Sequence, residues 1–174
     1  LWMHWGLKPS ALIGHSMGEN AAACVAGVMS YRDAVNLVHL RGQLFDSVEP
    51  GGMLSVPLSV KKLRSLLPSE LDLASVNAPE LCVVSGRDAD LDRFAKALSE
   101  QGVDTSRIPI NIAAHSRMLD GILPRFEAFL RGIRLNAPDI PILSNLTGQL
   151  LSDEEARDPG YWVRHLRSTV LFAE

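Results

Sequence analysis

The segment from Ala11 to Glu19, with the sequence ALIGHSMGE, constrains this chain more than any other part of it. A short apolar stretch that favours a strand runs into the pattern Gly-x-Ser-x-Gly, and an alanine-rich stretch that favours a helix follows. We expect Gly14 and Gly18 to avoid side-chain clashes across a sharp turn, so that Ser16 stands clear of the backbone. There the Met17 amide and the helix dipole can stabilise an oxyanion. The segment therefore predicts a serine nucleophile but leaves its target open.

Composition places the chain among ordinary globular proteins and excludes several classes of function. Its 174 residues are 47% hydrophobic and 21% charged, enough for one domain or for a domain with an inserted lobe. The net charge of −3 provides no basic surface for nucleic acid or for an anionic membrane, and no apolar run is long enough to span a bilayer. Two cysteines and no secretory signal pattern predict reduced thiols and a cytoplasmic location.

The middle of the chain has the pattern of a small α/β lobe. Apolar periodicity predicts strands at 53–56, 71–76, 81–85 and 103–108, and helices at 60–67 and 88–101. This order, βαββαβ, is typical of a ferredoxin-like lobe.

The flanking regions predict further helices and strands. Strands are expected at 11–14 and 142–144, a strand-like run at 110–114, and helices at 19–28, 31–46, 117–131 and 161–166. Ser30 is expected to cap the second of these helices, with Asp33 in the capping-box position.

A serine nucleophile needs a base, and the chain has five histidines: His4, His15, His39, His115 and His165. His15 lies inside the turn, where its side chain points away from that of Ser16, and His39 lies on the polar face of its helix. His115 follows the apolar run 110–114, and the carboxyl ends of strands are where active-site groups gather in α/β proteins. We therefore predict His115 as the base; the alternative is a hydrogen-bonded histidine at a helix cap.

Arg41 lies near the centre of an apolar helical stripe. At about 100° per residue, the stripe consists of Ala34, Leu37, Val38, Leu40, Leu44 and Phe45. A guanidinium on an inward face is costly unless it is paired. Two interpretations remain open: an internal salt bridge with Glu19 or another carboxylate, or a carboxylate that arrives with the substrate and is bound bidentately.

Together these motifs resemble the acyltransferase domains of modular polyketide synthases. The matching segments, in order, are GHSMGE at 14–19, Arg-Gly at 41–42 (25 residues after the serine), NAP at 77–79 with VVSG at 83–86, AHS at 114–116 before Met118, SNLTG at 144–148 and YWVRHL at 161–166. They cover nearly the whole chain.

The resemblance implies transfer of a malonyl-type extender unit, malonyl or methylmalonyl, from coenzyme A to the phosphopantetheine thiol of an acyl carrier protein. It implies Ser16 as the acylated nucleophile, His115 as general base and acid, and Arg41 as the clamp of the extender carboxylate. A backbone carbonyl, placed by the match at His165, orients the histidine in place of an aspartate. No bound cofactor or metal is expected, and a ketosynthase domain is expected in the same polypeptide.

The resemblance also implies an architecture. A hydrolase-like core with a parallel sheet is expected from residues 1–52 and 110–174, with the ferredoxin-like small lobe at 53–109 and the site between them. The family's upstream Gly-Gln-Gly segment, which completes the oxyanion hole, and the segment after Phe172 are absent. We therefore expect a chain truncated at both ends, with only part of the core, that is inactive alone.

The size of the extender unit stays open. In the family, the four residues that end at the catalytic histidine resemble His-Ala-Phe-His in malonyl-selective members and Tyr-Ala-Ser-His in methylmalonyl-selective members. The corresponding residues here, 112–115, are Ile-Ala-Ala-His. Ala114 leaves room for an α-methyl group, whereas many methylmalonyl-selective members have glutamine at the position of Met17. The expected substrate-binding side chains are Arg41, Met17, His15, Ala114 and Ile112.

Two other functions compete with this interpretation. An α/β-hydrolase-type esterase or thioesterase needs an acid between its serine and its histidine, and the candidates are Asp46, Asp72, Asp88, Asp90, Asp92 and Asp104. Arg41 would have no role in such an enzyme. A non-catalytic module that docks a carrier protein is the second alternative, and the presence of both Ser16 and His115 argues against it.

Overall fold

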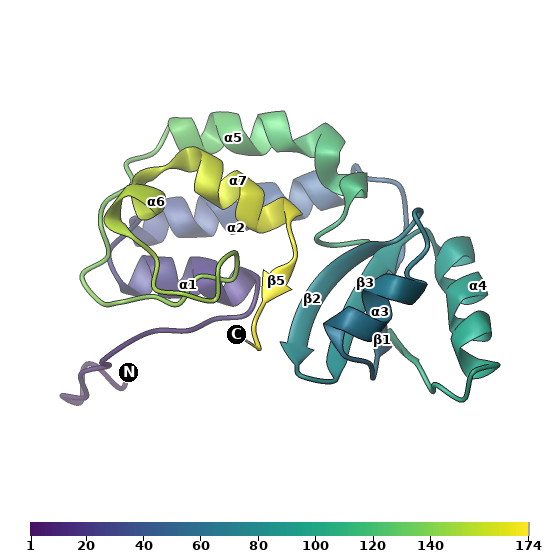
Figure 1. Ribbon diagram of the computed structural model, residues 1–174. Helices are drawn as coiled ribbons and strands as arrows, with labels where there is room; N and C mark the ends of the chain where they lie inside the picture. The colour runs from purple at the N-terminus through teal and green to yellow at the C-terminus, as the bar shows by residue number, and fades with distance from the viewer. Residues whose placement is uncertain (174) are drawn as a thin grey trace.

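The computed structural model describes residues 1–173, which form a helical part and a sheet part side by side (Figure 1). The helices are α1 (Met17–Val25), α2 (Tyr31–Phe45), α3 (Val60–Leu66), α4 (Asp88–Ser99), the 3-10 helix η1 (Arg117–Ile122), α5 (Leu123–Arg131), α6 (Asp153–Arg157) and α7 (Pro159–Arg167). The strands are β1 (Gly52–Val56), β2 (Asp72–Ala78), β3 (Leu81–Gly86), β4 (Ser106–Ile108) and β5 (Val170–Leu171). The chain therefore has an α/β fold, as predicted.

The sheet is mixed, with the strand order β4-β1-β3-β2-β5. Strands β1 to β4 pair antiparallel, with Leu54 opposite Val84, whereas β5 runs parallel to β2. The elements from β1 to β4 follow the predicted order, although β4 is shorter than the predicted strand at 103–108. The sequence did not predict β5, which brings the C-terminal part of the chain onto the edge of the sheet beside β2.

The two faces of the sheet pack against different neighbours because successive side chains in a strand point to opposite faces. Leu54 and Val84 belong to a buried cluster with Leu63 of α3 and Phe94 of α4. On the other face, Met53, Ala74 and Val83 enclose the side chain of Ala114. The segment just before His115 is thus anchored on the sheet.

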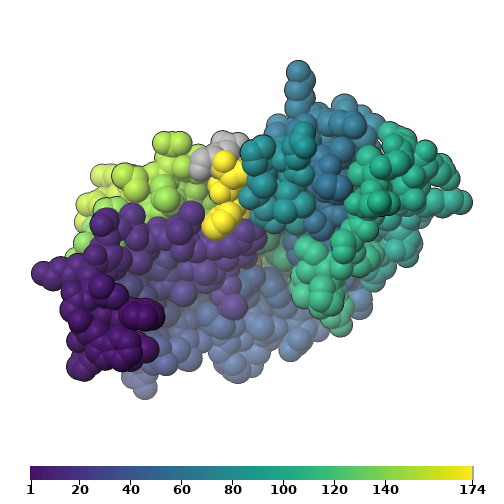
Figure 2. Space-filling model, turned by 90° about the horizontal axis from the view of Figure 1, so that it is seen from below, coloured from purple at the N-terminus to yellow at the C-terminus, as the bar shows by residue number. Residues whose placement is uncertain are grey.

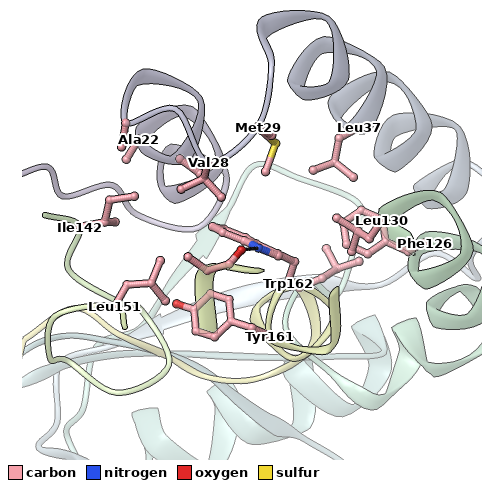
Figure 3. Close-up of a cluster of buried hydrophobic side chains, with 14 of the residues drawn as sticks. Ala22, Val28, Met29, Leu37, Phe126, Leu130, Ile142, Leu151, Tyr161 and Trp162 are labelled. Atoms are coloured by element: carbon pink, nitrogen blue, oxygen red, sulfur yellow. Dashed lines mark hydrogen bonds between the residues drawn. The ribbon is translucent and has the colours of Figure 1, made fainter. Parts of the chain in front are cut away.

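The helical part packs around two large aromatic side chains of α7, Tyr161 and Trp162, both fully buried (Figure 3). The Trp162 indole N–H donates to the Ala156 carbonyl, 3.0 Å away, so its burial leaves no unpaired donor. Amphipathic α5 contributes Phe126 and Leu130, four residues apart on one face. The predicted cap of α2 is confirmed, since Ser30 Oγ accepts from the Asp33 N–H.

Four predicted elements differ from the structure. The strands at 11–14 and 142–144 meet only in a parallel bridge between Leu12 and Ile142, so the expected parallel core sheet is reduced to one bridge in residues 1–173. The strand-like run at 110–114 is irregular, since the Ile110 N–H turns back to the Ile108 carbonyl. The helix at 117–131 divides into η1 and α5, with Pro124 in the first turn of α5, where its missing N–H is tolerated.

Replacing Phe126 by alanine is expected to lower the free energy of unfolding by about 3–5 kcal/mol, because the change leaves a cavity in the core. Tyr31→Ala is the matched control, since this ring is 78% exposed, with an expected change below about 0.5 kcal/mol. Urea denaturation followed by circular dichroism measures both changes. Equal losses in the two variants would contradict the described packing.

Candidate active site

Ser16 stands on a strained turn directly before α1. Its backbone angles, φ 51° and ψ −115°, are rare for a residue with a side chain and cost on the order of 1–3 kcal/mol. A Cβ on Gly14 would lie 2.1 Å from the Gly18 backbone carbon, so position 14 requires glycine. A Cβ on Gly18 would meet nothing within 4 Å, so the predicted steric role of that glycine is wrong. The backbone of Gly18 lies where a Cβ on Gly14 would be, so the turn needs a glycine at position 14 but would have room for a side chain at position 18.

The Ser16 hydroxyl is hydrogen-bonded to His115. Ser16 Oγ lies 2.8 Å from His115 Nε2, although 99 residues separate the two in sequence. On the other side of the ring, His115 Nδ1 lies 3.0 Å from the Ser168 carbonyl oxygen. Because a carbonyl can only accept, Nδ1 carries the proton and Nε2 is free to accept one from the serine.

The carbonyl that binds His115 Nδ1 belongs to Ser168, whereas the family resemblance placed it at His165. Ser168 is the C-cap of α7, and its extended backbone (φ −92°, ψ 168°) takes the chain out of the helix, so that its carbonyl is not in the helical ladder. His165 lies one turn earlier, inside α7, with its ring stacked on Tyr161. His165 Nε2 is buried 3.4 Å from Glu19 Oε2.

His115 is held in a buried loop rather than at the end of a strand. Its φ of 55° is in the left-handed region, and its side chain is 3% exposed. Burial, followed by the electrostatic influence of the neighbouring His165 and Arg41, lowers the pKa of His115 to about 3, although the Ser168 hydrogen bond opposes the shift. The imidazole is therefore neutral near pH 7 and ready to accept a proton.

Arg41 is a half-buried cation without a carboxylate partner among residues 1–173. Its guanidinium carbon lies 4.8 Å from the Phe45 ring centroid, and its buried Nε has no hydrogen-bond partner. Burial lowers the pKa of Arg41. The alternative of a salt bridge with Glu19 is wrong, because that carboxylate binds the Asn145 N–H and the Tyr161 hydroxyl.

The other expected substrate-binding residues point in different directions. His15 is exposed, and its Nε2 lies 2.8 Å from Asn77 Oδ1, which links the serine turn to β2. Met17 is 47% exposed. Ala114 is buried against the sheet, and Ile112 packs on the helical core. The hydrogen bonds therefore join Ser16 and His115 directly, whereas Ala114 and Ile112 face different clusters.

Sequence reasoning missed a buried polar group behind Ser16. Asn145 Oδ1 accepts from the Ser16 N–H, and Glu19, fully buried, accepts from the Asn145 N–H. The segment SNLTG at 144–148 contains Asn145, but its composition alone assigns no role to it.

Neither a metal site nor a membrane-spanning helix is found in the part of the chain that the structure describes. No group of three or more His, Cys, Asp or Glu side chains in residues 1–173 could hold a metal ion. Within the same residues, no helix combines the length and the apolar character needed to cross a bilayer.

Comparison with known proteins assigns the family. All of residues 1–174 match the family model described as the acyl transferase domain. The chain is 38% identical over 177 residues to the non-reducing polyketide synthase pks27 of Aspergillus flavus, an alignment that covers 99% of this chain and 9% of that synthase. The chain therefore spans a small fraction of such a relative.

Solved structures agree with this match. The acyl transferase domain of SpnD, solved in complex with 2-(pent-4-yn-1-yl)malonyl, superimposes with a TM-score of 0.94 and 42% identity, over 98% of this chain and 41% of that one. FabD from Acinetobacter baumannii gives a TM-score of 0.90 and 27% identity, over 98% of this chain and 58% of that one. The resemblance predicted from the motifs is confirmed.

The lowered pKa of His115 predicts an unusual pH dependence for the reactivity of Ser16. In the natural polypeptide that carries this sequence, the rate of reaction with a fluorophosphonate is expected to change less than about twofold between pH 8 and pH 5, because His115 stays neutral. A histidine with the ordinary pKa of about 6.5 would lose about 30-fold in rate at pH 5. Labelling kinetics followed by mass spectrometry measure the rate.

The control for this experiment is a measurement that the protein is still folded at each pH. Below about pH 6.5 the unfolded chain binds a proton at His115 that the folded chain does not. As the pH decreases below this value, the free energy of unfolding therefore falls by up to about 1.4 kcal/mol per pH unit. Circular dichroism at each pH must therefore accompany the kinetics. A loss of rate centred near pH 6.5 in folded protein would contradict the buried, neutral histidine.

Proposed function

This chain belongs to the acyl transferase domain family, and we propose that it moves a malonyl-type extender unit, malonyl or methylmalonyl, from coenzyme A to the phosphopantetheine thiol of an acyl carrier protein. The observation that carries the proposal is the 2.8 Å hydrogen bond between Ser16 Oγ and the unprotonated His115 Nε2. The similarity to polyketide synthases and to a domain solved with a substituted malonyl group supports this class of substrate. We propose further that a ketosynthase domain belongs to the same polypeptide.

In the first half of the proposed reaction, Ser16 becomes acylated. Its Oγ attacks the thioester carbonyl while His115 Nε2 takes the hydroxyl proton. The tetrahedral intermediate collapses, the carbon–sulfur bond breaks, and the coenzyme A thiolate takes the proton back from the imidazolium. The Ser168 carbonyl stabilises that imidazolium through Nδ1, which is the task of an aspartate in other serine enzymes.

The second half reverses these roles. The phosphopantetheine thiol gives its proton to His115 and attacks the ester carbonyl of acyl-Ser16. His115 then returns the proton to Ser16 Oγ as the carbon–oxygen ester bond breaks, which regenerates the free serine. The acyl group ends as a thioester on the carrier protein, and no oxidation or external energy source is needed.

Met17 is the proposed donor to the oxyanion in both halves. The Ser16 N–H is already bound to Asn145, and the N–H groups of Gly18 and Glu19 donate to the carbonyls of His15 and Ser16. Among residues 1–173, the Met17 N–H is thus the first-turn donor of α1 left without a partner. It lies at the positive end of the α1 dipole, where a negative oxygen is stabilised.

Arg41 is the proposed binding residue for the carboxylate of the extender unit. A half-buried guanidinium without a partner gains most from a ligand that arrives with a negative charge and two oxygens. Acetyl groups lack this charge, so Arg41 would select carboxylated acyl groups. We propose His15, Met17, Ala114 and Ile112 as further residues that shape the acyl site, with the size of the extender unit left open.

The finer architecture is also a proposal. We propose a hydrolase-like core from residues 1–52 and 110–174, and a ferredoxin-like small lobe at 53–109. The strand order β4-β1-β3-β2, with all neighbours antiparallel and α3 and α4 on one face, supports the lobe. The parallel bridge between Leu12 and Ile142 supports the core.

The competing functions have less support. An esterase of the α/β-hydrolase type needs a carboxylate on His115, but Nδ1 is bound to a backbone carbonyl, and Asp72 is bound by Arg117. A docking module without catalysis would not require Ser16 to adopt a strained conformation with its hydroxyl on His115.

The first test is covalent labelling of Ser16. When the natural polypeptide is incubated with malonyl-CoA and methylmalonyl-CoA in competition, we expect malonyl and methylmalonyl adducts on the peptide that contains Ser16, with a single acyl group per chain, measured by mass spectrometry. Ser16→Ala should abolish them, whereas Ser10→Ala, an exposed serine six residues earlier, should leave them unchanged. An adduct that persists in Ser16→Ala would contradict the proposed nucleophile, and the ratio of the two adducts gives the extender preference.

The second test concerns Arg41. Arg41→Ala is expected to reduce the preference for malonyl over acetyl transfer by about 10- to 100-fold, because hydrogen bonds to charged groups contribute about 1.5–3 kcal/mol each. Arg32→Ala, an exposed arginine on the same helix, is the matched control and should leave the preference unchanged. Transfer to a carrier protein from each acyl-CoA measures it. An unchanged ratio in Arg41→Ala would make Arg41 a purely structural residue.

A further inference from the structure

We propose that Asn145 is a positioning residue for the nucleophile, which it holds in its strained conformation through the backbone of the serine turn. In its link to acyl transfer the inference rests on the proposed function. The geometry itself concerns only the reactivity of Ser16, so it can be tested apart from any particular acyl donor.

The side-chain amide of Asn145 binds both sides of the turn. Asn145 Oδ1 accepts from the Ser16 N–H at 2.7 Å, and Asn145 Nδ2 donates to the Gly14 carbonyl at 2.8 Å. The N–H can only donate and the carbonyl can only accept, so the two bonds determine the orientation of the amide. Gly14 and Ser16 are the two neighbours of His15 in the chain. The two hydrogen bonds therefore fix the distance between the Gly14 carbonyl and the Ser16 N–H across the turn.

The backbone of Asn145 is held by hydrogen bonds at both its N–H and its carbonyl. Its N–H donates to Glu19 Oε2 at 2.7 Å, and its carbonyl accepts from the Leu171 N–H of β5, also at 2.7 Å. Asn145 is 3% exposed and Glu19 is fully buried. Water therefore competes little for these bonds, and the side chain starts from a rigid backbone.

The Glu19 carboxylate is held by a second group of buried side chains. The Tyr161 hydroxyl donates to Glu19 Oε1 and lies 2.7 Å from Ser144 Oγ. Burial and the adjacent Glu19 raise the pKa of Tyr161, so its hydroxyl keeps the proton that it donates. Glu19 lies three residues after Ser16 in α1, so the same helix that follows the nucleophile also fixes the residue that positions it.

This arrangement assigns distinct tasks to the two amides beside the nucleophile. Asn145 occupies the Ser16 N–H, which is therefore withdrawn from the oxyanion and used to maintain the turn. The N–H of Met17 stays available. Loss of the Asn145 amide would release the Ser16 backbone toward ordinary conformations and turn Oγ away from His115 Nε2.

The test compares Asn145→Ala with Asn145→Asp in the natural polypeptide. Asn145→Ala is expected to lower the rate constant for Ser16 fluorophosphonate labelling by about 100-fold, as is typical when a reacting group is misplaced by about 1 Å. Asn145→Asp keeps the acceptor for the Ser16 N–H but loses the donor to Gly14, and should recover part of that rate. Malonyl-CoA affinity, measured by calorimetry in the Ser16→Ala background, should stay within about twofold.

Asn136→Ala is the matched control. Asn136 is a half-buried asparagine whose Nδ2 donates to the Gly27 carbonyl at 3.3 Å, away from Ser16. It should lower the midpoint of thermal unfolding without slowing the labelling of Ser16. A general loss of stability would slow both variants alike, whereas a positioning role slows only the Asn145 variants.

The outcomes separate the inference from the proposed function. Normal labelling in folded Asn145→Ala would overturn the inference, and so would equal rates in Asn145→Asp and the unchanged protein. If Asn145→Ala does not fold, the labelling rates of Asn145→Asp and Asn136→Ala are compared instead. A slower rate in Asn145→Asp alone supports the inference, and equal rates overturn it. A slow Asn145 variant in a protein that accepts no acyl-CoA would support the positioning role and contradict the acyl transfer.

Discussion

The conformation of Ser16 is the constraint on which the rest of the site depends. A non-glycine residue at φ 51° and ψ −115° persists only where its surroundings determine it. Here the Gly14 and Gly18 backbones touch, α1 begins at the next residue, and the Asn145 amide binds across the turn. These contacts come from both ends of the chain, so the proposed nucleophile takes this conformation only in the folded protein.

His115, the proposed base, is placed by contacts from three distant segments. Ala114 anchors the loop of His115 on the sheet face made by Met53, Ala74 and Val83, while Ser168, at the end of α7, holds the far side of the ring. Directly after Ser168 the chain joins the sheet as β5, and this C-terminal segment lies between the N-terminal part and the sheet (Figure 2). Arg117, two residues after His115, also binds Asp72 of β2. His115 is therefore fixed where the helical part meets the sheet.

An electrostatic interaction connects Arg41 with His115. The charge of Arg41 is one of the influences that lower the pKa of His115, after burial and His165. In the proposed reaction the extender carboxylate neutralises Arg41, which removes that influence and makes His115 a stronger base when the correct acyl group is bound. The carboxylated substrate would thus contribute to its own recognition and to the activation of Ser16.

The sequence by itself determined the local features: the serine turn, the helix cap at Ser30, the order of elements from β1 to β4, and the family. These follow from spacings of a few residues or from periodicity, which adjacent side chains impose directly. It could also single out His115 and Arg41, because a histidine after an apolar run and an arginine on an apolar stripe are unusual. Only the tertiary structure decided that the carbonyl of Ser168 rather than that of His165 binds His115, that Glu19 binds Asn145 rather than Arg41, that Gly14 and not Gly18 is the turn glycine required sterically, and that β5 completes the sheet. The role of Gly14 depends on how closely the backbone of Gly18 approaches it in the turn. The other three depend on where a backbone carbonyl or amide points after segments more than 50 residues apart have packed, and the identity of a residue does not encode that direction.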